Sequence, residues 1–198
     1  MRLPWKETSS KPPFSMGVTV DVLSIIKQEH REVADLIDEA NECEAGDERL
    51  RELAEEIAKK LAMHLTIEER IFYSQLKARA EDEEEKVDMF EAYTEHAAAR
   101  SLMDMLKSGR KPDEQFKAEV QVLGENVKHH VEEEESKVWD IAREVLDQEE
   151  LEQMGEAWGK TKQRAMSRNG SSDGRARAGG AKKRAPRAAT RGRSKAGH

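Results

Sequence analysis

Separate stretches of this chain place histidine and glutamate on rows of residues that are otherwise apolar. The most informative stretch is 129–139, HHVEEEESKVW, where His130 and Glu134 lie four residues apart and therefore share one face of a helix. The same spacing recurs at His64 and Glu68 in HLTIEE. Burying such groups costs free energy unless they are paired or bind a metal ion. The pattern therefore predicts helices that surround a metal centre.

Apolar periodicity predicts four bundle helices, each with its polar residues in register with the apolar row. The expected ranges are about 21–43 with His30 on the row, 48–78 with His64 and Glu68, 86–108 with His96, and a helix opened by Pro112 and Asp113 with His130 and Glu134. Short loops make neighbouring helices antiparallel. At a rise of ~1.5 Å per residue, the six polar residues then fall in one slab of an up-down-up-down four-helix bundle.

A further amphipathic stretch, 148–165, is expected to pack across one end of the bundle as a short fifth helix through Leu151, Met154, Ala157 and Trp158. No internal repeat is apparent beyond the recurring H-x-x-x-E. The chain of 198 residues suits one domain with a tail. We therefore divide it into a flexible segment 1–19, an all-α domain 20–166 and a disordered basic tail 167–198.

Composition indicates the cellular setting of the protein. Charged residues make up 38 % of the chain and the mean hydropathy is −0.88, which suits solvent-exposed helices. No apolar run approaches the ~18 residues that would span a bilayer. Cys43 is the single cysteine, and the amino-terminal stretch lacks the apolar core of a secretory signal. We therefore expect a cytoplasmic protein that does not enter the membrane.

The donor atoms indicate which metals would suit the centre. Imidazole nitrogen with carboxylate oxygen suits iron, manganese or zinc, and the absence of cysteine ligands argues against a thiolate zinc site. Two carboxylates can each bridge two cations and so offset the repulsion between them. A ferritin-like site would need Glu-x-x-His pairs, and no histidine here has a glutamate three residues before it. The sequence therefore favours a different dinuclear arrangement.

Five stretches, read in order, resemble the hemerythrin-like, or HHE cation-binding, family over about residues 20–165. They are QEHREVADLI, HLTIEERIFYSQL, TEHAAARSL, HHVEEEESKVW and the closing segment EELEQMGEAWGKTK. Each stretch alone is weak evidence for the family, but the first four in this order and at these intervals are a specific signal. The resemblance implies a four-helix bundle with a non-haem di-iron centre. By that resemblance the metal ligands are His30, His64, Glu68, His96, His130 and Glu134.

The chain departs from the oxygen-carrying members of that family at one position. Those members have a further histidine four residues after the one on the third helix, where this chain has Arg100. Water, His129 or Tyr93 could take that place. An open position favours reaction with oxygen, peroxide or nitric oxide over reversible oxygen carriage. The alternatives are stoichiometric binding or sensing, and an enzyme with catalase-like or iron-centre repair activity.

Structural alternatives exist for each residue. A lone buried histidine is more often a hydrogen-bonded core residue than a ligand, and the six together could in principle stabilise a bundle that holds no metal. His129 is one step off the apolar row, which favours a solvent-exposed or supporting role. Tyr93 could simply pack in the core. The remaining glutamates of these stretches suit a solvated helix face: Glu69, Glu132, Glu133 and Glu135.

The carboxyl-terminal tail differs in charge from the rest of the chain. Residues 168–198 contain ten Lys and Arg and one acid, Asp173, for a charge of +9, which leaves −16 for residues 1–167. The tail has no apolar pattern and is expected to be disordered. It could bind DNA or another polyanion non-specifically, as in a DNA-associated protein that holds iron, or it could be solvated or folded onto the acidic body.

Overall fold

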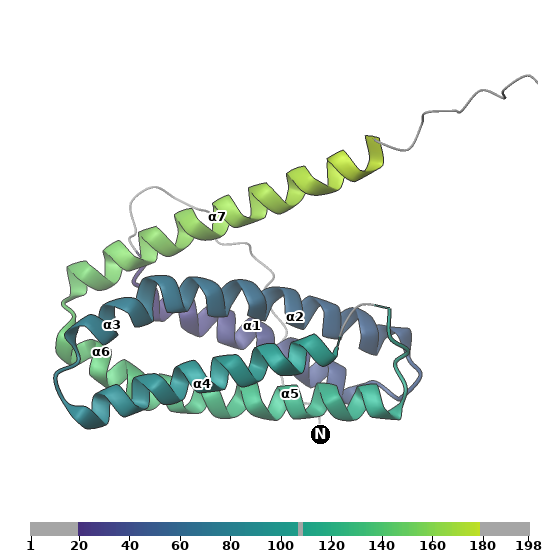
Figure 1. Ribbon diagram of the computed structural model, residues 1–198, viewed down its shortest axis with the longest axis horizontal. Coiled ribbons are helices and arrows are strands. Elements are labelled where there is room, and N and C mark those ends of the chain that lie inside the picture. The colour runs from purple at the N-terminus through teal and green to yellow at the C-terminus, as the bar shows by residue number, and fades with distance from the viewer. Residues whose placement is uncertain (1–19, 107–108, 179–198) are drawn as a thin grey trace, which may run out of the picture. The chain divides into compact units, whose positions relative to one another are not determined.

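The computed structural model describes residues 20–106 and 109–178, and all regular secondary structure in these ranges is helical (Figure 1). The elements are α1 (Val22–Glu42), α2 (Glu48–Glu68), η1 (Glu69–Tyr73), α3 (Ser74–Arg79), α4 (Glu83–Met105), α5 (Glu114–Glu133), η2 (Glu134–Val138), α6 (Trp139–Val145) and α7 (Gln148–Ala178). The chain divides into two units, Met1–Lys162 and Gln163–His198, and the bundle belongs to the first. The predicted flexible segment 1–19 lies outside the described residues.

Each long bundle helix begins at an aspartate whose side chain accepts a hydrogen bond from a backbone N–H of the first turn. Asp21 accepts from Ser24, and Asp113 accepts from Phe116, both at 2.9 Å. Asp47 and Asp82 cap α2 and α4 in the same way. Such a cap contributes about 1 kcal/mol by satisfying an amide that has no partner within the helix. The predicted starts at Asp21 and Asp113 are confirmed.

Four helices form the bundle, and two of them are composite. The second consists of α2, η1 and α3, and the fourth of α5, η2 and α6. Figure 1 shows α1, α2, α4 and α5 side by side; α1 packs against α2 and α5, and α4 packs against α5. This arrangement confirms the predicted all-α bundle.

The two composite helices each contain a π-helical turn, at Glu69–Tyr73 and at Glu134–Val138. A π turn holds one extra residue, so it rotates the side chains that follow it relative to an uninterrupted α-helix. An uninterrupted α-helix would place Ile71, three residues after Glu68, on the buried face, whereas Phe72 and Tyr73 are fully buried and Ile71 is only partly buried. The π turns therefore change which aromatic residues face inward beyond the polar slab.

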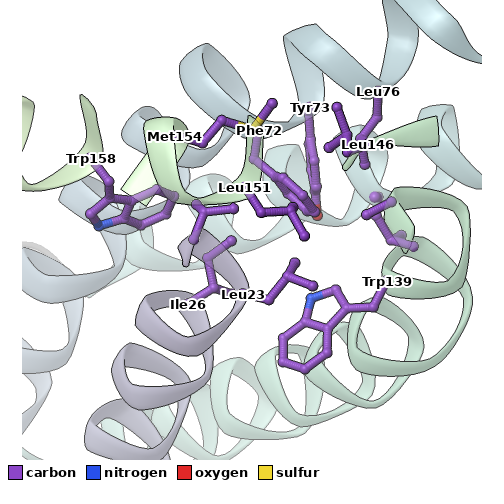
Figure 2. Close-up of a cluster of buried hydrophobic side chains, with 14 of the residues drawn as sticks. Leu23, Ile26, Phe72, Tyr73, Leu76, Trp139, Leu146, Leu151, Met154 and Trp158 are labelled. Atoms are coloured by element: carbon purple, nitrogen blue, oxygen red, sulfur yellow. The ribbon is translucent and has the colours of Figure 1, made fainter. Parts of the chain in front are cut away.

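Two apolar clusters fill the bundle, one on each side of the polar slab. The first, which we call the tryptophan cluster, is partly drawn in Figure 2 and consists of Val22, Leu23, Ile26, Ile67, Phe72, Tyr73, Leu76, Met89, Ala92, Val138, Trp139, Ala142, Leu146, Leu151, Met154 and Trp158. The second, the leucine cluster, consists of Val33, Ile37, Ala40, Leu50, Leu53, Ala54, Ile57, Leu61, Leu65, Ala99, Leu106, Phe116, Val120, Leu123 and Val127. Successive bundle helices run between the clusters in opposite directions, which is the up-down-up-down topology.

Helix α7 closes the end of the bundle that contains the tryptophan cluster. Its Leu151, Met154 and Trp158 are buried there, as the sequence predicted (Figure 2). Gly155 is required because a Cβ atom at this position would lie 2.0 Å from the backbone oxygen of Val20. Small size, rather than backbone freedom, therefore determines this glycine.

The structure differs from the sequence-based boundary at the end of this helix. We predicted a helix that ends near residue 165 and a disordered tail from 167, whereas α7 continues to Ala178. Extending an existing helix adds a backbone hydrogen bond per residue without a new nucleation cost. The rest of the predicted tail, 179–198, lies outside the described residues. Within the described ranges, no helix combines the length and apolar character needed to cross a membrane.

Candidate metal centre

Six polar side chains from four helices meet between the two apolar clusters, and none is more than 5 % exposed. They are His30 of α1, His64 and Glu68 of α2, His96 of α4, His130 of α5 and Glu134, the first residue of η2. All six belong to the set of ligands that the sequence predicted. The structure brings them into one slab, where trios of their donor atoms lie within 4.8 Å of one another.

The four histidines form two pairs. The ring centroids of His30 and His64 are 5.0 Å apart. Those of His96 and His130 are 4.6 Å apart, and their Nε2 atoms lie 3.1 Å from each other. Each pair therefore presents two imidazole nitrogens to one small region of the core.

The two carboxylates lie between the histidine pairs. Glu68 contacts one histidine of each pair, and Glu134 contacts the other histidine of each pair. The distances from Nε2 to carboxylate Oε2 are 3.4 Å for His64–Glu68, 3.3 Å for His96–Glu68, 3.1 Å for His30–Glu134 and 3.7 Å for His130–Glu134. Each carboxylate therefore links the two histidine pairs, and the six side chains together offer the donor atoms of a cation-binding site.

A glutamate from another helix holds the outer nitrogen of every one of these histidines. The distances from Nδ1 to the carboxylate oxygen are 3.2 Å for His30–Glu135, 2.9 Å for His64–Glu29, 2.9 Å for His96–Glu69 and 2.9 Å for His130–Glu95. With Nδ1–H donating to a carboxylate, the neutral ring directs the lone pair of Nε2 inward. Histidines that bind metal ions are oriented in this way, and the carboxylate also raises the basicity of the ligand.

The centre consists of two halves related by a constant sequence offset. Five pairs of equivalent residues are each separated by 66 positions: Glu29 and Glu95, His30 and His96, His64 and His130, Glu68 and Glu134, Glu69 and Glu135. A π turn begins at the last pair in one half and one residue earlier in the other. We call these the α1–α2 half and the α4–α5 half. Our expectation of no repeat beyond H-x-x-x-E was therefore incomplete.

Several inward polar atoms lack a hydrogen-bond partner among the described residues. They are Nε2 of His30 and His64, both carboxylate oxygens of Glu68 and Glu134, and the hydroxyl of Tyr73. Leaving one buried polar group unpaired costs about 1–3 kcal/mol, and more for a charged group. Unpaired nitrogens and oxygens that converge on the same region, with their outer partners already fixed, fit bound cations.

The metal-free protein compensates for the two buried carboxylates with protons. Burial and the neighbouring charge of Glu134 raise the pKa of Glu68 well above its usual range. Burial would also raise the pKa of Glu134, but contacts with His30 and the charges of His30 and His130 lower it. Burial lowers the pKa of His30, yet Glu134 and Glu135 outweigh this effect and raise it to about 9. The pKa values of the two carboxylates therefore shift in opposite directions, because Glu134 faces His30 whereas Glu68 faces Glu134.

Tyr73 is a component of the centre that the sequence analysis missed. Its ring is fully buried and stacks on His96 with centroids 5.2 Å apart. Burial and the negative charges of Glu134 and Glu68 raise the pKa of its hydroxyl well above the usual value, so the hydroxyl keeps its proton. The π turn at Glu69–Tyr73 brings this side chain inward. The helical period of the sequence therefore gave no signal for it.

The side chains considered for the open position each have contacts of their own. Tyr93 is partly buried and packs edge-on against Tyr73, with ring centroids 5.4 Å apart. The His129 side chain is 62 % exposed and faces Glu95 and Glu133. Arg100, where oxygen-carrying relatives have a histidine, donates to Glu69 at 2.7 Å. Through Glu69 it supports the orientation of His96.

Two of the glutamates that we assigned to a solvated face contact the histidines instead. Glu69 and Glu135 accept from His96 and His30, whereas Glu132 is exposed and pairs with Lys128. The other two histidine partners, Glu29 and Glu95, were not anticipated. The only signal for them is that each directly precedes a histidine of the apolar row.

A cavity of about 10 Å³ lies beside the histidines, on the side of the leucine cluster. All four inward histidines line it, together with Val33, Leu61, Leu65, Ala99 and Val127. This volume is enough for about one water-sized molecule. A site of this size suits a small ligand and is too narrow for a metabolite.

Fold and site together define a class: a helical bundle whose core presents four histidines and two carboxylates to cations. Residues 21–142 match the model of the hemerythrin HHE cation-binding domain, and the chain belongs to that family. The fold is similar to the crystal structure of a hemerythrin HHE cation-binding domain-containing protein from Mycobacterium kansasii. That similarity has a TM-score of 0.63 at 21 % identity and covers 73 % of this chain and 86 % of the other. No protein with curated function matches the chain.

Proposed function

We propose that this protein holds two iron ions and uses them to bind, sense or react with oxygen, peroxide or nitric oxide. The observation that carries the proposal is the position of Glu68 and Glu134, each in contact with one histidine of both pairs. Imidazole and carboxylate without thiolate suit iron. When bound, two iron ions would supply the electrons that reduce or bind a small oxidant.

The protein's own residues have distinct roles in this proposal. The Nε2 atoms of the four histidines would hold the iron ions, the carboxylates of Glu68 and Glu134 would offset the repulsion between them, and the four outer glutamates fix the orientation of the imidazole rings. Tyr73 keeps a protonated hydroxyl close to the carboxylates, where it can donate a hydrogen bond. The cavity beside the histidines limits the ligand to a molecule of one or a few atoms.

Metal analysis of the purified protein tests the proposal. We expect two iron equivalents per chain after anaerobic reconstitution. Glu68→Ala and Glu134→Ala should each lower this content to one equivalent or none, because the remaining charges are less compensated. Glu132→Ala is the matched control, since this glutamate is exposed and contacts none of the six residues. Full loading in both bridging variants would contradict the assignment.

Peroxide distinguishes the two forms of the proposal. A sensor or carrier changes its optical spectrum after about one equivalent of ligand and then stops. An enzyme with catalase-like activity consumes many equivalents while the iron content stays constant. If the optical spectrum of the iron-loaded protein does not change with oxygen, peroxide or nitric oxide, both the sensor and the enzyme form of the proposal are wrong.

The basic tail supports a separate proposal, that residues 168–198 bind DNA or another polyanion. Its ten basic residues can contact phosphates, and no aromatic residue is present to stack on bases, so binding would be non-specific. Full-length protein should be retained on DNA in a manner that weakens as salt rises. A chain that ends at Ser167 should lose this retention, and equal retention would contradict the proposal.

A further inference from the structure

Two potential ligands outside the buried centre, His129 and Glu133, converge at the surface of the α4–α5 half with Glu95, the outer partner of His130. The Nε2 atom of His129 lies 3.4 Å from Oε1 of Glu95 and 3.7 Å from Oε2 of Glu133. These donor atoms all lie within 4.8 Å of one another. Catalytic zinc sites likewise use three protein ligands and leave one position open to water.

Each carboxylate uses one oxygen elsewhere and leaves the other for this cluster. Oε2 of Glu95 accepts from Nδ1 of His130 at 2.9 Å, and Oε1 of Glu133 accepts from Lys137 at 2.9 Å. The outer partners therefore fix both carboxylates while Oε1 of Glu95 and Oε2 of Glu133 point to His129. The geometry of the cluster is set by contacts outside it.

A narrow pocket is lined by two residues of the cluster and one of the centre. It is lined by Asp88, Glu91, Glu95, Glu133 and Glu134, with Ala92, Lys137 and Val138. Glu134 is only 1 % exposed, and neither of its carboxylate oxygens has a hydrogen-bond partner among the described residues. The buried carboxylate of Glu134, which contacts His30 and His130, thus lines the same acidic pocket as two of the surface ligands.

The α1–α2 half has no such cluster. The residues equivalent to His129 and Glu133 are Met63 and Ile67, which are apolar. The outer oxygen of Glu29, the counterpart of Glu95, accepts from Trp158 and Lys162 of α7. The acidic side of the α4–α5 half is therefore where a cation would meet protein ligands first.

We propose that Glu95, His129 and Glu133 form an outer site for a divalent cation, from which the cation passes along the acidic pocket to Glu134. The outer site does not depend on the proposed function of the buried centre. Only the transfer step rests on that function. Lys137 neutralises Glu133 when the outer site holds no cation and moves aside when a cation binds.

Calorimetric titration of the full-length, metal-free protein with Zn²⁺ tests the outer site. We expect two equivalents from the buried centre and a third, weaker one. His129→Ala and Glu133→Gln should weaken the third at least about tenfold, since even residues that only support a ligand change metal affinity by that amount. Glu132→Gln, which removes the same charge from the same helix, should match the unaltered protein.

The outer site would be overturned if the unaltered protein bound no third Zn²⁺ equivalent, or if His129→Ala and Glu133→Gln both bound it unchanged. If instead the buried centre binds no metal, the unaltered protein should bind one Zn²⁺ equivalent only, and His129→Ala should remove it. For the transfer step, anaerobic uptake of Fe²⁺ is followed by its loss from a colorimetric chelator. His129→Ala should slow uptake at least about threefold without lowering the final content, and an unchanged rate would overturn the transfer step.

Discussion

The α1–α2 and α4–α5 halves build the same ligand geometry but differ in what lies outside it. In the first, Glu29 is 8 % exposed and accepts from Trp158 at 3.0 Å and Lys162 at 2.7 Å, so α7 covers it. In the second, Glu95 faces an exposed histidine and an acidic pocket. The same ligand residues in different surroundings indicate that both halves constrain the histidines, whereas α7 covers the outer glutamate of only one half.

Replacement of the two equivalent glutamates separates these functions and should have the largest effect. Glu29→Gln and Glu95→Gln each remove the carboxylate that orients a histidine, so each should weaken metal binding about 10-fold to 100-fold. Only Glu29→Gln also removes the carboxylate that pairs with Lys162, whose side chain is 39 % exposed, so the free energy of unfolding should fall by up to about 1 kcal/mol. Metal titration and urea denaturation of both variants measure the two effects. Equal stability losses would show that α7 does not distinguish the halves.

The pKa values of the equivalent histidines His30 and His96 are shifted in opposite directions in the metal-free protein. Burial and the charge of His130 lower the pKa of His96 to about 3, whereas that of His30 is raised to about 9. A histidine with a raised folded-state pKa stabilises the protein fully below its unfolded value of 6.5. This contribution is lost as pH rises through 9. The raised pKa of Glu68 acts in the same direction.

We therefore expect the metal-free protein to lose up to roughly 3 kcal/mol of unfolding free energy between pH 6.5 and 9. Urea denaturation at several pH values in this window provides the measurement. The metal-loaded protein is the control, because His30 is then held neutral as a ligand and the loss should be absent. A metal-free protein that becomes more stable as pH rises would contradict the assignment of the proton to His30.

Contact between α7 and the start of α1 can be tested with two glycines one turn apart. Gly155→Ala would place a Cβ atom 2.0 Å from the backbone oxygen of Val20, so α7 must shift. We expect a loss of about 1–3 kcal/mol in unfolding free energy. Gly159→Ala meets nothing within 4 Å and should instead stabilise the helix by up to about 1 kcal/mol. Thermal denaturation compares the two, and a stabilising Gly155→Ala would contradict the packing.

Sequence periodicity was enough to predict the bundle and the slab of six polar residues, because His30, His64 and their counterparts replace apolar residues on regular rows. It did not predict Tyr73, since a π turn breaks the period on which the prediction rested. Nor did it predict Glu29 and Glu95, which lie beside the apolar row and reach a neighbouring helix. The constant 66-residue offset was present in the sequence and would have paired these glutamates.

Tyr73 gives the smallest expected change in stability and the most specific test of the centre. Its equivalent 66 positions later is Trp139, so the phenol occurs in one half only. Tyr73→Phe removes a buried hydroxyl that has no hydrogen-bond partner among the described residues, and the unfolding free energy should change by less than about 1 kcal/mol. Tyr93→Phe is the control because that ring is partly buried and packs edge-on against Tyr73. Both variants should load two iron equivalents, but only Tyr73→Phe should alter the optical spectrum and the rate of its change with peroxide. If the spectra and rates of the two variants are the same, the Tyr73 hydroxyl does not act in the centre, and its inward position reflects the packing of the π turn alone.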